Sequence, residues 1–266
     1  MQIKQPRGFP QGYTPITAIT GAHPDMLLDF GILKLAGGGR HASGAGLERA
    51  YLLLGGEVQV QWEGGSRRIA RRSLFDEPPW CLHLPAGGAA TLTAGEGGAE
   101  LACQATANPR PFAAHLYSPE QCRSEERGQG TLRETSTRLV RTVIDNTTAP
   151  SANLVLGEAV TFPGKWSSYP PHHHPQPEIY HYRFLPARGF GLTAIGERAY
   201  VLADGDTVLI REGEVHPQAA APGYAMYYLW VIRHLDGRRY TTPTFLPEHA
   251  WTMDAQAVIW PDEEKS

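Results

Sequence analysis

The sequence predicts an all-β protein built as two tandem β-barrels of the jelly-roll type. The chain contains 29 glycines and 22 prolines, and between them lie short segments rich in Val, Leu, Tyr and Thr. These residue types favour strands separated by turns. No long amphipathic helical pattern interrupts them. The segments recur on both sides of one polar stretch, which indicates two barrels of similar design.

Each half carries strand segments of ordinary length. In the first half they lie at 26–35, 50–62 around the Gly55-Gly56 turn, 80–84, 89–94 and 99–107. In the second half they lie at 152–162, 178–184, 190–195, 207–211 and 224–233. The stretch between them, SPEQCRSEERGQGTLRE, is charged and poor in large apolar residues, which favours a connector. We therefore expect an N-terminal barrel over 1–117, a linker over 118–134 and a C-terminal barrel over 135–266.

Composition indicates a small-molecule partner. The 24 Lys and Arg nearly balance the 27 Asp and Glu, and no basic stripe or helix-turn-helix pattern is present, so neither nucleic acid nor membrane is an expected partner. The first residues lack the apolar run of a signal peptide, and no stretch approaches the roughly 18 apolar residues of a membrane span. Three cysteines without CxxC spacing indicate reduced thiols. We expect a cytoplasmic protein, and a homo-oligomer is compatible with the sequence.

A histidine-rich segment in the second half predicts a metal site. In YPPHHHPQPE, His172 and His174 lie two residues apart and Glu178 follows four residues later. Residues two apart in extended backbone face the same side, so these side chains can point into one barrel. Imidazole with carboxylate suits Zn, Mn, Fe, Co or Ni, with zinc slightly favoured here. Fewer than six protein ligands leave positions open for water or substrate.

A second segment, GDTVLIREGEVH, delivers His216 after a strand and a glycine turn. The two segments together resemble the cupin superfamily, whose first motif is HxH followed after three or four residues by Glu. Its second motif is Gly, five residues, Pro-x-Gly, two residues and His. Arg211 stands in place of the proline and Ala220 where asparagine is usual, which alters the turn and leaves the ligands intact. The resemblance implies a bicupin that holds one divalent ion through His216 and the three earlier side chains.

The first half repeats this pattern with ligands missing. His41 and Glu48 keep the first histidine and the glutamate, but Ser43 replaces the second histidine and Ala90 the last one. Two of four potential ligands are too few for tight divalent binding. We expect a vestigial site and a structural or interface role for the N-terminal barrel.

The wider sequence is similar to one enzyme family. The runs FPGKWSSYPPHHH, PEIYHYRF, VHPQAAAPGY and PEHAW resemble the 5-deoxy-glucuronate isomerases of bacterial myo-inositol catabolism, most densely over 138–251. The spacing from the second histidine to the glutamate is shorter here than is usual in that family. The resemblance implies an intramolecular oxidoreductase, an aldose–ketose isomerase that converts 5-deoxy-D-glucuronate to 5-keto-2-deoxy-D-gluconate. The alternatives are the 4-deoxy-5-ketouronate isomerase of pectin breakdown, a cupin dioxygenase, and a sugar-acid sensor without catalytic activity.

Such an isomerisation moves a hydrogen between neighbouring carbons, either as a proton through an enediol or as a hydride. A metal serves as Lewis acid in both routes, and the proton route also needs an acid–base group. Tyr180 and Tyr182 share strand parity with Glu178, so these three side chains are the catalytic candidates. His181 and Arg183 fall on the opposite face by the same alternation.

Substrate binding requires further side chains. A substrate carboxylate favours a cationic partner, for which Lys165, Arg183 and Arg239 are the candidates. In the run YAMYYLWV, alternation turns one of Tyr227 and Tyr228 toward the cavity, and we take Tyr228 as the substrate-binding candidate.

Overall fold

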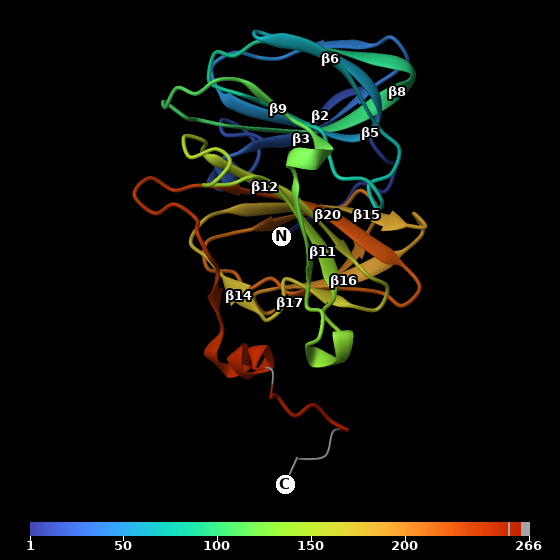
Figure 1. Ribbon diagram of the computed structural model, residues 1–266, viewed down its shortest axis with the longest axis vertical. Coiled ribbons are helices and arrows are strands. Elements are labelled where there is room, and N and C mark those ends of the chain that lie inside the picture. The colour runs from blue at the N-terminus through green and yellow to red at the C-terminus, as the bar shows by residue number, and fades with distance from the viewer. Residues whose placement is uncertain (255, 262–266) are drawn as a thin grey trace.

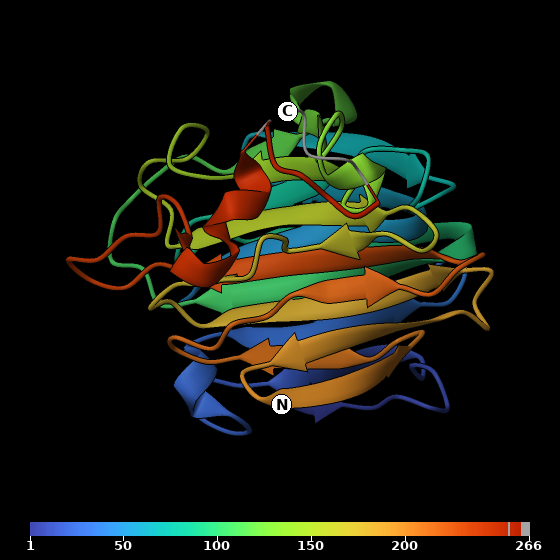
Figure 2. The ribbon, with the colours of Figure 1, turned by 90° about the horizontal axis from the view of Figure 1, so that it is seen from below.

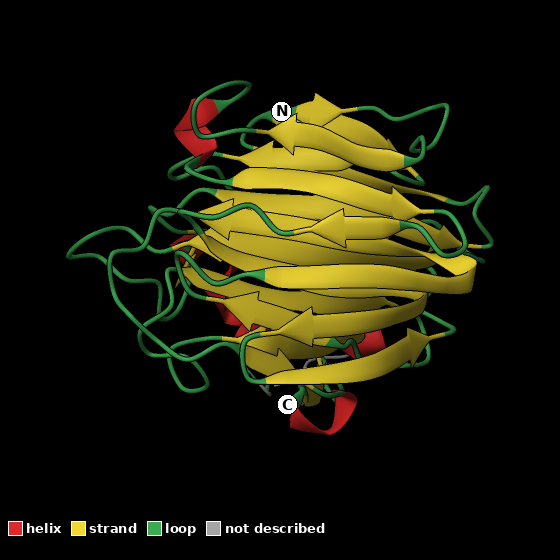
Figure 3. Cartoon of the chain, turned by 90° about the horizontal axis from the view of Figure 1, so that it is seen from above, coloured by secondary structure: helices red, strands yellow, loops and turns green. Residues whose placement is uncertain are grey.

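The chain folds as two stacked β-barrels, which confirms the predicted fold class. The computed structural model describes residues 1–254 and 256–261. In Figure 1 the strands of the first half lie above those of the second half, and Figure 3 shows the helices confined to the periphery. Within the described residues, the helices are the 3-10 turns η1 (Pro24–Met26), η2 (Pro119–Gln121), η3 (Leu132–Glu134) and η4 (Pro247–Met253). None of them has the length and apolarity to cross a membrane.

The N-terminal barrel is formed by a sheet of order β2-β3-β8-β5-β7-β9, with β4 paired to β8 and β6 paired to β5. Its strands are β2 (Gly12–Thr17), β3 (Asp29–Leu35), β4 (Arg40–Ala42), β5 (Glu48–Trp62), β6 (Gly65–Arg71), β7 (Cys81–Leu84), β8 (Ala90–Thr106) and β9 (His115–Tyr117). The segments predicted at 89–94 and 99–107 are one strand, β8, and the glycine pair predicted as a turn lies inside β5. Register shifts on both sides of Gly56 bend β5 as it leaves β7 and joins β6. A side chain at Gly56, where φ is +89°, would meet the carbonyl of Gly98.

The C-terminal barrel has a seven-stranded sheet of order β1-β18-β15-β20-β12-β11-β10, a second sheet of order β13-β19-β16-β17 and a β14-β21 pair. Its strands are β1 (Gln2–Ile3), β10 (Arg123–Arg127), β11 (Arg138–Ile144), β12 (Leu154–Thr161), β13 (Trp166–Ser167), β14 (His172–His173), β15 (Glu178–Leu185), β16 (Phe190–Ile195), β17 (Arg198–Ala203), β18 (Thr207–Ile210), β19 (Gln218–Ala220), β20 (Ala225–Arg233) and β21 (Thr244–Phe245). Figure 2 shows this half from below, with η4 in front of its strands.

Both edges of the seven-stranded sheet come from outside 135–266. Strand β1, at the start of the chain, pairs with β18, and β10, inside the predicted linker, pairs with β11 along its whole length. The rest of that linker contains the turns η2 and η3, as a connector does. The division into 1–117, 118–134 and 135–266 stays a proposal for the two barrel cores. The C-terminal barrel also includes β1 and β10, which lie outside 135–266.

The apolar core has three layers, because the central strands are buried on both faces. In β15, Tyr180 and Tyr182 point into the C-terminal barrel, whereas Ile179 joins residues of the first half in a core between the barrels. In β5, Tyr51 points into the N-terminal barrel and Leu52 into the middle layer. Alternate side chains of one strand therefore enter different cores, which makes the two barrels one packed unit.

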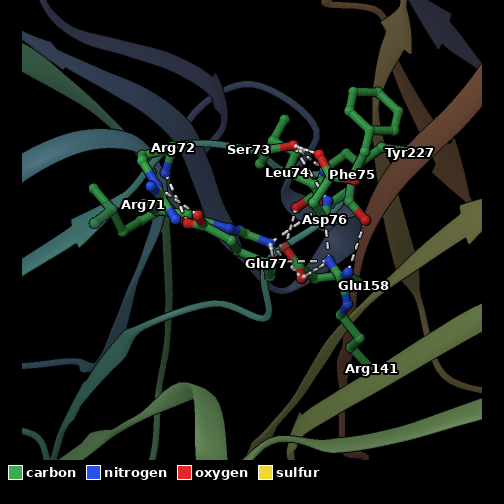
Figure 4. Close-up of polar contacts among 11 residues, drawn as sticks. Arg71, Arg72, Ser73, Leu74, Phe75, Asp76, Glu77, Arg141, Glu158 and Tyr227 are labelled. Carbon is green, nitrogen blue, oxygen red and sulfur yellow. Dashed lines mark hydrogen bonds and ion pairs between the residues drawn. The ribbon is translucent and has the colours of Figure 1, made fainter.

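A buried ionic cluster crosses the middle layer (Figure 4). The Arg71 guanidinium, from the first half, donates to both carboxylate oxygens of Glu158, from β12, at 2.7 and 2.8 Å. The Tyr227 hydroxyl donates to the same carboxylate at 2.6 Å. Arg141 lies 3.6 Å from it and donates to the carbonyls of the loop after β6. Side chains of Arg71 and Glu158 are fully buried, so this contact fixes how the barrels stack.

Candidate metal centre

The structure gathers three predicted ligands at one point inside the C-terminal barrel. The candidate ligand atoms of His174, Glu178 and His216 all lie within 4.8 Å of one another, and all three residues are buried. The Glu178 Oε2 atom is 3.0 Å from Nε2 of His174 and 3.3 Å from Nε2 of His216. Among the described residues this is the one group of its kind. Its members come from the start of β15, the segment just before it and the turn after β18.

Backbone contacts set the orientation of the imidazole rings. Each ring places Nδ1 beside a carbonyl oxygen two residues away, at 2.9 Å for His172, 3.0 Å for His174 and 2.8 Å for His216. A carbonyl only accepts, so Nδ1 carries the proton and Nε2 is left with a free lone pair, as in histidines that ligate metals. The Nε2 atom of His216 is buried without a hydrogen-bond partner. A divalent ion would satisfy this atom, so the donor set fits the metal that the sequence predicts.

His172 lies beside this group. Its ring is edge-on to that of His216, with the centroids 4.9 Å apart, and it is outside the tightest cluster. Its role as fourth ligand stays a prediction. Burial lowers the pKa of His172 to about 4 and lowers the pKa of His216 as well, so both rings are neutral at pH 7, the form that binds metal.

The turn that precedes His216 accommodates Arg211, which stands in place of the proline of the cupin motif. Gly213 has φ of +75°, which favours glycine. The Arg211 carbonyl accepts from the Glu214 amide at 3.1 Å, which closes the turn. The Arg211 side chain extends away and donates to Asp25 at 2.6 Å. The other departure, Ala220, is buried in the C-terminal core.

Acidification should destabilise the metal-free protein. Burial lowers the pKa of His234 to about 4, and its Nδ1 accepts from the Tyr240 amide at 2.9 Å. A histidine whose pKa is lower when folded contributes fully above its unfolded pKa of about 6.5, and this stability is lost as the pH falls toward 4. We expect urea unfolding to show this decline. The variant His234→Asn should flatten it by up to about 1.4 kcal/mol per pH unit, and an identical pH profile in that variant would contradict the prediction.

A cavity of about 450 Å³ opens beside the candidate metal ligands. Tyr180 and Tyr228 line it together with His172, His174 and Glu178. Tyr227 points the other way, as strand alternation requires. Tyr182 is fully buried, and its hydroxyl donates to Gln218 at 2.6 Å rather than lining the cavity.

The three predicted cations are not among the described residues that line the cavity. Arg183 lies on the opposite face of β15, where it pairs with Glu100 and Asp204. Arg239 donates to Asn146 at 2.7 and 2.9 Å. Lys165 is half-buried in the turn before β13. The structure therefore does not bring these side chains to the candidate metal ligands.

Sequence reasoning missed the arginines that do reach the cavity, which are Arg123, Arg127 and Arg138. Arg138 begins β11, and it lines the cavity together with Val140 and Thr142, the alternate residues of that strand. The signal was present in RLVRTVI, whose polar and apolar residues partly alternate, but β11 was not among the predicted strands.

In the first half, the residues of the incomplete ligand pattern make structural contacts. The Glu48 carboxylate is buried and accepts hydrogen bonds from His83 Nε2 at 2.8 Å, from the Asn108 amide at 2.7 Å and from the Asn153 backbone at 2.7 Å. His41 instead lies 3.4 Å from the Tyr51 hydroxyl. Glu48 therefore links the two halves of the chain.

Two stacked barrels with a His/Glu cluster inside the second define the protein as a bicupin. The fold of oxalate decarboxylase from Bacillus subtilis agrees, with a TM-score of 0.63 and 12% identity over 92% of this chain and 79% of that one. Mn(II) centres are described for that enzyme. An IolB-like protein from Salmonella typhimurium is more similar, with a TM-score of 0.81 and 26% identity over 92% of this chain and 96% of that one.

The chain belongs to the KduI/IolB family, whose model matches residues 2–252. Among its relatives is the 5-deoxy-glucuronate isomerase of Geobacillus kaustophilus, 27% identical over 79% of both chains. Another is the 5-deoxy-glucuronate isomerase of Geobacillus thermodenitrificans, 28% identical over 79% of this chain and 80% of that one.

Proposed function

We propose that the protein is an aldose–ketose isomerase that converts 5-deoxy-D-glucuronate to 5-keto-2-deoxy-D-gluconate in myo-inositol catabolism. The observation that carries this proposal is the 450 Å³ cavity, which is lined by His174 and Glu178 of the His/Glu cluster together with Tyr180, Tyr228 and three arginines. The relatives named 5-deoxy-glucuronate isomerase support the choice of substrate.

The proposed ligands of one divalent ion are His172, His174, Glu178 and His216, with zinc slightly favoured because a His/Glu donor set is common for it. When bound, the ion supplies a Lewis acid for the substrate carbonyl and the neighbouring hydroxyl. The chain orients the imidazoles through their carbonyl contacts.

Tyr180 is the proposed proton donor. Its hydroxyl lies 3.0 Å from the Ser168 hydroxyl, and its ring centroid lies 5.6 Å from that of His216. Burial raises the pKa of Tyr180 well above its usual value, so the phenol keeps its proton at neutral pH and can donate to a substrate oxygen. Glu178 is the nearby carboxylate and the remaining candidate for the base.

A pair of tyrosine variants separates catalysis from packing. Tyr180→Phe should lower kcat by roughly 10²-fold, the lower end of acid–base contributions, with bound metal unchanged. Tyr182→Phe should lose its bond to Gln218, which costs about 1 kcal/mol of stability, and keep kcat. Steady-state kinetics and metal analysis of both variants test this. Equal kcat values would remove Tyr180 from the reaction.

The function itself is tested with two substrates and an oxygen electrode. Metal-loaded protein should isomerise 5-deoxy-glucuronate faster than 4-deoxy-5-ketouronate and consume no oxygen. Preference for the second substrate would identify the pectin-pathway activity, oxygen uptake would identify a dioxygenase, and binding without turnover would identify a sensor.

We further propose a cytoplasmic enzyme whose partner is a small sugar acid rather than nucleic acid or a membrane. The three cysteines, Cys81, Cys103 and Cys122, are free and buried, which suits a reducing compartment. A homo-oligomer is compatible with the sequence, which does not give the oligomeric state.

A further inference from the structure

We propose that Arg138 forms a carboxylate-binding subsite in the cavity, separate from the metal ligands, and that it selects acidic sugars over neutral ones. The inference rests on the proposed function for its natural substrate. The subsite itself is argued from the position, fixation and charge of this one guanidinium.

Backbone carbonyls hold the Arg138 side chain in place. Its Nη1 donates to the Ser136 carbonyl at 2.7 Å and its Nη2 donates to the Tyr169 carbonyl at 3.1 Å. Arginine has five N–H donors in a fixed plane, so donors remain for a ligand. A guanidinium fixed in this way can accept a carboxylate in the bidentate geometry without a large loss of side-chain entropy.

Among the described residues, no carboxylate pairs with Arg138. The two other arginines of the cavity are paired already, Arg123 with Glu125 and Asp145, and Arg127 with Glu125. Burial lowers the pKa of Arg138, since its positive charge is removed from water without an acidic neighbour to compensate. An anionic ligand would provide that compensation.

The contacts along the cavity wall link this arginine to the metal centre. The ring of His216 contacts that of Tyr180, which contacts that of Tyr228 at a centroid distance of 4.7 Å. The two tyrosine hydroxyls bond to Ser168 and Ser167, and the next residue, Tyr169, supplies the carbonyl that holds Arg138.

Arg138 makes no hydrogen bond or ion pair with the four proposed ligands within the described part of the chain. The cavity is thus lined by the proposed metal ligands His172, His174 and Glu178 and by a separate cation, with Tyr180 and Tyr228 also in its wall. An open-chain sugar acid has the complementary order, with a carbonyl at one end, hydroxyls between and a carboxylate at the other end. A neutral sugar would leave the guanidinium unpaired in the cavity, which is the arrangement that gives strong discrimination.

Calorimetric binding to the metal-free protein tests the subsite without any turnover. The probes are D-glucuronate and the neutral D-glucuronamide, and the variants are Arg138→Gln and Arg138→Lys. We expect the wild-type protein to prefer glucuronate by roughly 10- to 100-fold, the worth of a charged hydrogen-bonded pair. The preference should vanish in Arg138→Gln and be partly kept in Arg138→Lys. Arg127→Gln, whose charge is already paired, is the matched comparison and should change the preference by less than about threefold.

The outcomes separate this inference from the proposed function. Equal binding of both probes by the wild-type protein, or an unchanged preference in Arg138→Gln, would overturn the subsite even if 5-deoxy-glucuronate is isomerised. If the protein prefers glucuronate through Arg138 but does not isomerise 5-deoxy-glucuronate, the subsite is supported and the proposed substrate is wrong. If Arg138→Gln fails to fold, Arg138→Lys replaces it, and a preference in that variant equal to that of the wild-type protein and of Arg127→Gln would overturn the subsite.

Discussion

Replacing His174 with alanine is expected to remove most of the bound metal and most of the activity together. His174 is buried, and its Nε2 lies 3.0 Å from the Glu178 carboxylate at the centre of the proposed ligand set. Without this ligand the ion has too few protein donors to be held tightly. A bound Lewis acid would lower the barrier by several kcal/mol, so turnover should fall on the order of 10³-fold when it is lost. Metal analysis after dialysis and an isomerase assay measure the two effects.

Two other histidines serve as controls. His173 directly precedes His174 and has the opposite strand parity, and His41 lies in the N-terminal barrel near Tyr51. His173→Ala and His41→Ala should keep both metal and turnover. Full turnover by His174→Ala would exclude the metal mechanism, and parallel losses in all three variants would indicate general misfolding.

Replacing Glu158 with alanine is expected to lower the free energy of unfolding by about 3–5 kcal/mol. The change leaves the fully buried Arg71 guanidinium without its carboxylate partner, although it still donates to backbone carbonyls, and leaves the Tyr227 hydroxyl without its acceptor. The change also removes an ion pair between the two barrels, because Arg71 and the loop after β6 belong to the first half and Glu158 belongs to β12 (Figure 4). Urea unfolding of the metal-loaded protein gives the loss directly.

The matched control is an exposed ion pair nearby. Arg72 pairs with Glu77 at 2.9 Å, but its side chain is 91% exposed, so Arg72→Ala should cost about 0–1 kcal/mol. Glu158→Gln, which keeps the shape and loses the charge, should lie between the two. A Glu158→Ala loss no larger than that of Arg72→Ala would show that the cluster does not hold the barrels together.

The proposed metal ligands could be predicted because their signal is local. His172, His174 and Glu178 lie within seven residues of sequence, and Gly213 marks the turn before His216. The structure adds a bend at 175–176, so β14 and β15 lie in different sheets although His174 and Glu178 still come together. Strand alternation separated Tyr228 from Tyr227. Inferences of this kind need only the spacing of residues within a short segment of sequence.

The parts that were missed depend on contacts far apart in the chain. The pairing of β1 with β18 joins residues more than 200 positions apart, and the charged run RSEER becomes the edge strand β10 only because β11 is beside it. Arg138 lines the cavity because β11 lies in the large sheet, which no local window indicates. Arg183 had the expected charge, but its face of β15 meets the N-terminal barrel.

The most direct test of the metal-dependent isomerase is proton NMR of the metal-loaded protein with 5-deoxy-glucuronate in deuterated water, beside a chelator-treated sample. We predict signals of 5-keto-2-deoxy-gluconate in the first sample and none in the second. Deuterium in the product would indicate an enediol, and its absence a hydride shift or a shielded proton. No conversion by the metal-loaded protein, or equal conversion after chelation, would contradict the account.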